Sequence, residues 1–594
     1  MAINLSTLRF TNKADIIPPL GTKAEIFNTG TANTLGGNDS ITGTGGSFGI
    51  YNDTGSTINI GAGNDTITGE GTSTGIFNLG TIHTSAGNDK ITGYGNQQLG
   101  ILNFEKSKID TGAGDDYIFG EGSGGGIENT TGTINTGNGN DSINGFGGSI
   151  GISGGGTINT GNGNDSINGF GLDDDRSIGI NNFGTAKIDT GDGNDSIIGT
   201  GNQIGIFNSI FNNEKPKIDT GDGNDSIVGS SRGSFGIYND GIINTSAGRD
   251  TITGNSTQGN GIYNDGTIDT GDGRDIITGA GGIGINNSGT IDTGDGKDSI
   301  TGTSNGTGNG SYGIFNGIGA TIDTGSGNDT ITGNGGLIGI ENRSGTIDGG
   351  AGNDFISGTG IAFGITCDSQ GLSQGIISGG DGNDTISGTA VAGVPGYGLG
   401  INGTISGGDG NDSITGNAPN GLGIFINNRE FGIPGGTIDG GAGNDLISGT
   451  GQVGINNSSG TIVGGTGNDT IIGTGTQVGI INDSTIDTGC GNDMVDALTG
   501  GFAGNGTTRL GDGKDIIKGF GSGFFDGGNG KDMLLFGAGK YTVSKTTDNE
   551  GFYTISLGST DMHVKNFEFI GNANNPGMAF SFSNIIGHNF PVPL

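Results

Sequence analysis

One acidic, glycine-rich phrase recurs along this sequence with almost no change. It reads DTGDGNDSIIG over residues 189–199 and DTGDGNDSIVG over residues 219–229. The GxGND part of each copy ends in an aspartate, Asp195 in the first and Asp225 in the second. A carboxylate therefore returns at the same place in every repeat. Carboxylates that lie close together repel one another unless a cation lies between them. The chemistry that this pattern indicates is therefore the binding of cations.

The aspartates that close the phrase are the candidate metal ligands of the chain. There are twenty of them, and most successive members lie 23 to 33 residues apart, with a last step of 17. They are Asp39, Asp65, Asp89, Asp116, Asp141, Asp165, Asp195, Asp225, Asp250, Asp275, Asp298, Asp329, Asp354, Asp384, Asp412, Asp445, Asp469, Asp493, Asp515 and Asp532. If the repeats stack at the strand spacing of about 4.8 Å, each carboxylate lies beside that of the next repeat. We expect shared divalent ions to relieve the repulsion along this column.

The elements that must position these carboxylates are three short extended segments per repeat. Examples are TID at 267–269, DTI at 329–331 and GIYN at 236–239, each with one isoleucine among polar residues and glycine. This period-2 pattern is typical of strands with one buried face. A helix is excluded because glycine recurs every few positions, at about 1 kcal/mol each. The pattern predicts an all-β fold, a right-handed parallel β-solenoid (β-roll or β-helix) of about twenty coils with a small β C-terminal region.

The extent of the repeat divides the chain into three predicted parts. Residues 1–24 are expected to form an N-terminal cap, residues 25–535 the solenoid repeats, and residues 536–594 a C-terminal cap. Within the last part, apolar and polar residues alternate on both sides of residues 548–551, which predicts a hairpin.

Composition limits the classes of function. The chain has 23 basic and 60 acidic residues and a net charge of −37, so that nucleic acid and anionic membranes are not expected partners. Glycine and proline supply 141 and 9 of the 594 residues, which with a regular period indicates a repeat array rather than disorder. No stretch reaches the apolar length of a membrane span, and the N-terminus lacks the apolar run of a cleaved signal peptide.

Four copies of the phrase match the nonapeptide G-G-x-G-x-D-x-U-x. They read GGAGNDFIS, GGDGNDTIS, GGDGNDSIT and GGAGNDLIS, and they begin at Gly349, Gly379, Gly407 and Gly440. In these residues the chain resembles the calcium-binding repeats of the RTX, or haemolysin-type, family over about residues 36–535. The resemblance implies that adjacent turns share calcium ions, held by the column aspartates and by turn carbonyls. It also implies an extracellular or cell-surface protein that leaves the cell through a type I exporter, with residues 536–594 as the secretion-signal region.

The chemistry of the turn agrees with calcium as the ion. Calcium takes six to eight oxygen ligands from carboxylates and backbone carbonyls. Glycines at positions 1, 2 and 4 of the nonapeptide are expected to adopt left-handed conformations that turn their carbonyls toward one point. The chain departs from the family because one nonapeptide alternates with a longer segment, which predicts a calcium ladder on one edge only. Threonine at position 1, as at Thr190 and Thr220, predicts weaker binding in some turns.

Two further columns follow the GIxN segments. Their asparagines, such as Asn208 and Asn239, are expected to stack as an amide ladder that supports the fold. The aromatic residues beside them, such as Phe207 and Tyr238, are expected to point outward, for lateral packing across a sheet face or for stacking on sugar rings. The threonines of TID resemble the arrays of ice-binding solenoids, but the adjacent aspartate and the irregular insertions argue against that role.

These observations predict a secreted calcium-binding repeat protein of RTX type that folds when calcium binds outside the cell. Its expected role is structural, adhesive or surface-binding, with calcium ions, the exporter and a cell-surface or matrix polysaccharide as partners. No catalytic residue and no further cofactor are predicted. The alternative is an extracellular polysaccharide-modifying enzyme, lyase- or epimerase-like, on a β-solenoid. This alternative stays open because the basic residues Arg249, Arg274 and Lys297 directly precede column aspartates.

Overall fold

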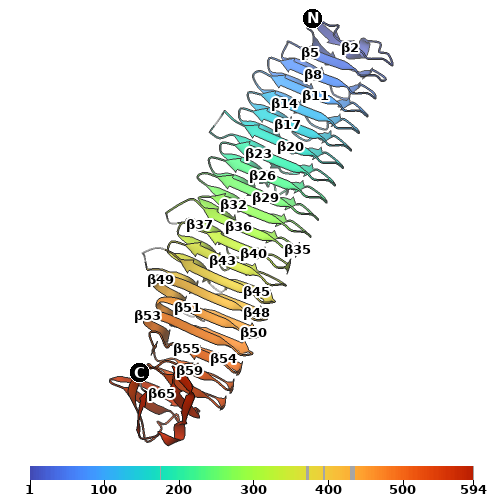
Figure 1. The fold of residues 1–594 in the computed structure, drawn as a ribbon. Coiled ribbons are helices and arrows are strands. Elements are labelled where there is room, and N and C mark those ends of the chain that lie inside the picture. The colour runs from blue at the N-terminus through green and yellow to red at the C-terminus, as the bar shows by residue number, and fades with distance from the viewer. Residues whose placement is uncertain (174, 309, 370–373, 392–394, 428–434, 593–594) are drawn as a thin grey trace. The chain divides into compact units, whose positions relative to one another are not determined.

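The structure, a computed structural model, describes all residues except 174, 309, 370–373, 392–394, 428–434, 593 and 594. The chain divides into two compact units, Met1–Asp295 and Gly296–Leu594. Each unit is built from short parallel strands stacked coil on coil (Figure 1). The prediction of an all-β parallel solenoid with about twenty coils is confirmed. Among the described residues, the helices are the short 3-10 turns η1 (Leu5–Thr7) and η2 (Phe582–Asn584), and no helix there could cross a membrane.

One coil of the first unit illustrates how the strands are arranged. Its strands are β25 (Lys217–Asp219), β26 (Ser226–Ser231) and β27 (Phe235–Asn239). We call the corresponding strands of the other coils the first, second and third rows. Each strand pairs in parallel with strands of its own row, as β25 does with β22 (Lys187–Asp189) and β26 with β23 (Ser196–Gly201). The GxGND turn therefore joins a first-row strand to a second-row strand.

Columns of isoleucine form the core, one beneath each row. Ile218, Ile227 and Ile237 are fully buried. Each of them is paired in register with the isoleucine of the preceding coil. Burial of one such side chain contributes about 1.5–3 kcal/mol. Because a shift by one residue would turn these side chains outward, the apolar columns also set the register of the polar residues beside them.

A ladder of buried asparagines runs along the third row, as predicted. Asn208 Nδ2 donates to Asn239 Oδ1 at 2.7 Å, and Asn239 Nδ2 donates to Asn264 Oδ1 at 2.8 Å. Asn239 Nδ2 also lies 3.0 Å from the backbone carbonyl oxygen of Thr267, in a first-row strand. The amide ladder therefore ties the third row to the first row as well as coil to coil.

Replacing Asn239 by alanine is expected to lower the free energy of unfolding of the first unit by about 2 kcal/mol. Asn208 then loses an acceptor and Asn264 loses a donor in the dry interior, and each such loss costs about 1–3 kcal/mol. The measurement is urea unfolding followed by far-UV circular dichroism. Asn255→Ala, at an exposed second-row position, is the matched control. Equal unfolding midpoints for the two variants would contradict the structural role of the ladder.

Short strands at the N-terminal end continue the rows. The strand β1 (Ala2–Asn4) pairs in parallel with β3 (Glu25–Asn28). The strand β2 (Ile16–Ile17) pairs in parallel with β5 (Ser40–Thr44). Leu5 in η1 is fully buried at this end. The first residues therefore cover the first complete coil with a partial coil of the same design.

The C-terminal region of the second unit changes from parallel to antiparallel pairing. The strand β65 (Thr560–Lys565) still pairs in parallel with β60 (Phe524–Asp526) of the last repeat. The strand β63 (Gly539–Val543) pairs antiparallel with β64 (Tyr553–Leu557), which confirms the predicted hairpin. This small β region thus covers the end of the stacked strands with a different topology.

Candidate metal centre

The column aspartates lie in the turns that join first-row strands to second-row strands. All twenty are buried, with at most 4% of each residue exposed. Within each unit they follow one another coil by coil along one edge, so that the structure brings together the side chains that the sequence singled out. The carboxylates are therefore enclosed by the turns and are not solvated.

Hydrogen bonds from backbone to carboxylate link these aspartates into what we call the inner ladder. The N–H of Asp195 donates to Oδ1 of Asp225 at 2.8 Å, and the N–H of Asp225 donates to Oδ1 of Asp250 at 2.8 Å. The same bond recurs from coil to coil within both units at 2.7–2.9 Å. Each carboxylate thus holds the turn of the preceding coil.

Two acidic residues outside the repeated phrase extend the inner ladder at its ends. The N–H of Asp15 donates to Oδ1 of Asp39 at 2.6 Å, and the N–H of Asp532 donates to Oε2 of Glu568 at 2.8 Å. Neither Asp15 nor Glu568 was predicted as a site residue. Asp15 lies 24 residues before Asp39, and this repeat spacing is the signal that could have found it. Glu568 lies 36 residues after Asp532, where the repeat has ended, and carries no such signal.

The asparagine of the GND phrase forms an outer ladder that runs in the opposite sense. The N–H of Asn224 donates to Oδ1 of Asn194 at 2.7 Å, and the N–H of Asn194 donates to Oδ1 of Asn164 at 2.7 Å. The asparagine side chain therefore binds the following coil, whereas the aspartate side chain binds the preceding one. These asparagines were missed as site residues, although their recurrence before the aspartates was visible in the sequence.

Arginine interrupts the outer ladder at two coils of the first unit. The N–H of Arg249 still donates to Oδ1 of Asn224 at 3.0 Å. The N–H of Arg274 instead donates to the backbone carbonyl of Gly248 at 3.2 Å, because the arginine side chain of the preceding coil has no acceptor. The basic side chains that motivated the enzyme alternative thus occupy positions of a structural column.

The second carboxylate oxygen, Oδ2, is buried and has no hydrogen-bond partner along most of the column. The described residues with this feature include Asp39, Asp65, Asp89, Asp116, Asp141, Asp165, Asp195, Asp225, Asp250, Asp329, Asp354, Asp384, Asp412, Asp445, Asp469, Asp493, Asp515 and Asp532. A buried acceptor without a partner costs about 1–3 kcal/mol, and more when it is charged. The inner ladder therefore presents a row of buried oxygen atoms that can accept a proton or contact a cation.

Burial raises the pKa of several carboxyl groups of the column, and repulsion between neighbouring carboxylates adds to the rise in some of them. Burial raises the pKa of Asp65 to about 7; the hydrogen bond from the Asp39 N–H opposes the rise, and repulsion from Asp89 and Asp39 adds to it. The pKa of Asp354 is likewise raised to about 7, with burial as the largest cause. At neutral pH the column therefore favours either a bound proton or a nearby positive charge.

Two glycines of each GxGND turn adopt left-handed conformations, which confirms the prediction for positions 2 and 4. Gly221 and Gly223 have φ angles of +74° and +154°. A Cβ atom on Gly223 would lie 1.4 Å from the carbonyl oxygen of Gly193 in the preceding coil. Position 4 therefore requires glycine both for its backbone conformation and for the close stacking of the turns.

The prediction of a left-handed backbone conformation is wrong for the glycine at position 1 of the nonapeptide. Gly379 does not have a left-handed conformation. A Cβ atom on Gly379 would lie 2.5 Å from Oδ2 of Asp384 and 2.6 Å from the carbonyl oxygen of Gly407. Glycine at position 1 thus leaves a space beside the carboxylate and does not serve to turn the backbone.

Position 1 distinguishes two kinds of turn. In threonine turns a hydroxyl lies near the carboxylate, as Thr190 Oγ1 does while it donates to the Thr220 carbonyl at 3.3 Å. Burial raises the pKa of Asp195 to about 6, and hydrogen bonds from the Asp165 N–H and from Thr190 oppose the rise. In the turns with glycine at position 1, the point where a Cβ atom would lie is 2.4–2.8 Å from two oxygens, Oδ2 of the column aspartate in the same turn and a backbone carbonyl oxygen of the next coil. This holds at Gly349, Gly379, Gly407, Gly440 and Gly464.

The donor atoms of these turns fit a hard cation. In the described part of the chain, no three or more His, Cys, Asp or Glu side chains gather around one point. A metal in the turns would therefore take few carboxylate oxygens and complete its shell with backbone carbonyls. Calcium accepts such an oxygen shell, whereas zinc sites in proteins are built from histidine, cysteine and carboxylate side chains.

Comparisons with known proteins show a likeness in fold to solved structures but identify no family. No protein-family model and no curated protein matches this chain. A solved structure that it resembles is a hyperactive, Ca²⁺-dependent, β-helical antifreeze protein from an Antarctic bacterium. The likeness has 18% sequence identity and a TM-score of 0.31, and it covers 61% of this chain and 86% of that chain. What the turns bind is therefore inferred from this chain's own residues.

Proposed function

We propose that this chain is a secreted, calcium-binding repeat protein of RTX type whose coils fold as calcium binds outside the cell. The observation that carries the proposal is the column of buried aspartates, in most of which, as in Asp225 and Asp384, the Oδ2 atom has no hydrogen-bond partner. The glycine turns support it, because Oδ2 and a carbonyl oxygen face one space in each of them. The proposed role is structural, adhesive or surface-binding.

The residues of the column link ion binding to folding. Bound calcium supplies positive charge beside carboxylates that repel one another in a chain of net charge −37. Without it, each ionised carboxylate must be buried beside the next, so that the stacked turns are disfavoured at neutral pH. Because the turns exist only in the folded coils, the free energy of ion binding becomes free energy of folding.

This coupling suits a protein that is exported before it folds. Extracellular calcium modules bind with dissociation constants of about 10⁻⁴–10⁻³ M, which matches calcium outside the cell and not inside it. An acidic chain that remains loose in the cytosol can pass through a type I exporter. The proposed export route rests on the resemblance of the repeats to the RTX family.

A calcium titration followed by far-UV circular dichroism, with reversal by a chelator, tests the proposal at neutral pH. Strand content is expected to rise with calcium and to fall when the chelator is added, whereas magnesium at the same concentration has a smaller effect. Calorimetry is expected to count several ions per chain. Strand content that does not respond to the chelator would overturn the proposal.

Two variants in one glycine turn locate the ions. Asp384→Asn keeps the Oδ1 acceptor of the inner ladder but removes the charge at the buried position, so that fewer calcium ions should bind per chain. Asp381→Asn changes an exposed acid of the same turn and is the matched control. Equal calcium stoichiometry in the two variants would place the ions elsewhere.

A further inference from the structure

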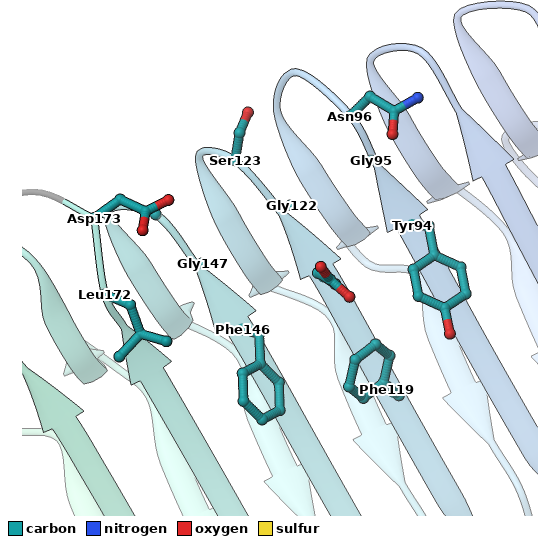
Figure 2. A pocket seen from close by; sticks show the side chains of 12 residues that line it. Tyr94, Gly95, Asn96, Phe119, Gly122, Ser123, Phe146, Gly147, Leu172 and Asp173 are labelled. Carbon is teal, nitrogen blue, oxygen red and sulfur yellow. The ribbon is translucent and has the colours of Figure 1, made fainter.

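A groove with aromatic walls lies on the outer face of the second row in the first unit (Figure 2). Its volume is about 570 Å³. It extends over β11 (Lys90–Gly95), β14 (Tyr117–Gly122), β17 (Ser142–Gly147) and the residues that follow β20 (Ser166–Gly171). The side chains that define it are Tyr94, Phe119, Glu121, Phe146, Leu172 and Asp173. None of them is used by the metal centre.

Strand register aligns these side chains across successive coils. Tyr94 is paired with Glu121, and Glu121 is paired with Phe146, so that a carboxylate lies between two rings. Phe119 contacts both rings, with centroid distances of 5.7 Å to Tyr94 and 5.5 Å to Phe146. The rings are tilted by 53° and 34°, which leaves part of each ring surface uncovered. Tyr94 is 39% exposed.

The fold does not require aromatic residues at these positions. Farther along the same register the equivalent residues are Thr200, Ser230 and Asn255, in coils with the same core. Large rings exposed on a sheet face cost solubility and commonly mark a binding surface when they are contiguous. The aromatic side chains of the groove therefore replace the polar residues found at the same position in other coils, and the stacking of the coils does not explain this difference.

Charge restricts what the groove can bind. Glu121 and Asp173 line it, and its described lining contains no lysine or arginine. Lys90, on the same strand as Tyr94, packs over the ring of Tyr117 at 5.3 Å. An anionic polymer would meet the uncompensated carboxylates of Glu121 and Asp173. The groove therefore disfavours an anionic ligand.

We propose that this groove binds a neutral polysaccharide chain. Rings of this kind offer apolar surface to the C–H face of a sugar, while the carboxylates accept hydrogen bonds from its hydroxyl groups. Asn96 and Ser123 lie at the loop tips beside the rings, where they add donors and acceptors (Figure 2). Coils about 4.8 Å apart present such groups at regular intervals, as a polymer of repeating sugars requires. The inference deepens the proposed surface-binding role and rests on it.

Calorimetric titration of the calcium-loaded full chain tests the inference with three neutral probes, cellohexaose, xylohexaose and mannohexaose. Hexagalacturonate is the anionic comparison. At least one neutral probe is expected to bind, and Phe146→Ala is expected to weaken it about tenfold, which corresponds to about 1.4 kcal/mol. Glu121→Gln is expected to weaken it less. Phe580→Ala, at a 56% exposed position of the C-terminal region, is the control and should leave the affinity unchanged.

Three results would overturn the inference. They are no heat of binding with any neutral probe at millimolar concentration, tighter binding of hexagalacturonate, or equal weakening by Phe146→Ala and Phe580→Ala. Circular dichroism of the same samples with and without chelator reports the calcium coupling separately. If the chain binds sugar but its strand content does not change with the chelator, only the proposed function is contradicted. If its strand content falls with the chelator but no sugar binds, only the inference about the groove is contradicted.

Discussion

Metal-free protein is expected to retain its strands at pH 5 and to lose them progressively toward pH 8. The pKa of a column carboxyl such as Asp116 or Asp225 is raised to about 7 in the folded chain, with burial as the largest cause. In the unfolded chain an aspartate titrates near pH 4. Between these values the folded state holds more protons, so that its stability is present below about pH 4 and is lost as the pH rises through about 7.

Calcium should largely remove this pH dependence of stability. The measurement is far-UV circular dichroism in urea, with chelator or with calcium, at pH 5 and pH 8. The rise in the urea midpoint produced by calcium is expected to be several times larger at pH 8, because protons already neutralise the column at pH 5. The calcium-loaded protein serves as the control and should vary little between the two pH values. Metal-free midpoints that are equal at pH 5 and pH 8 would contradict the account.

Gly193→Ala is expected to destabilise the first unit by about 4 kcal/mol. Gly193 has a φ of +150°, and a Cβ atom there would lie 1.6 Å from the carbonyl oxygen of Gly163. The left-handed strain costs about 1–3 kcal/mol, and the displacement of the stacked turn adds about 1–3 kcal/mol. Urea unfolding in saturating calcium, followed by circular dichroism, measures the loss.

A second alanine variant separates the cost of backbone strain from the cost of disturbing the stacked turns. Gly55 has a φ of +72°, but nothing lies within 4 Å of the Cβ atom that an alanine would add. Gly55→Ala is therefore expected to cost only about 1–2 kcal/mol, the conformational part of the penalty. If the two alanine variants unfolded at the same urea concentration, close contact between successive turns would not be a requirement of the fold.

The repeat made the fold predictable from local pattern. Ile218, Ile227 and Ile237 each lie in a short period-2 segment, and the same segments return in coil after coil. Because each strand pairs in register with its own counterpart, local spacing already contained the long-range contacts. The asparagine ladder through Asn239 was predictable for the same reason. The column of aspartates and its position on one edge were likewise present in the sequence.

The tertiary structure decided the environment of each carboxylate. The sequence alone could not tell that Oδ1 of Asp225 accepts the N–H of Asp195 while its Oδ2 remains without a partner. It could not assign Glu568 to the end of the inner ladder or Gly379 to the space beside Asp384. These features depend on which atoms of a neighbouring coil lie within about 3 Å, a distance that residue type and spacing do not encode.

The aromatic groove also combines features that the repeat predicts with features that only the tertiary structure shows. Tyr94, Glu121 and Phe146 each lie five residues after a column aspartate and between two glycines, so the repeat aligns them, but it does not show which of their side chains reach the surface. Strand register places them side by side. The sequence by itself determined what repeats, because apolar burial at a fixed period leaves one way to stack the coils. The structure decided what is buried, paired or exposed, because these properties arise only where separate coils meet.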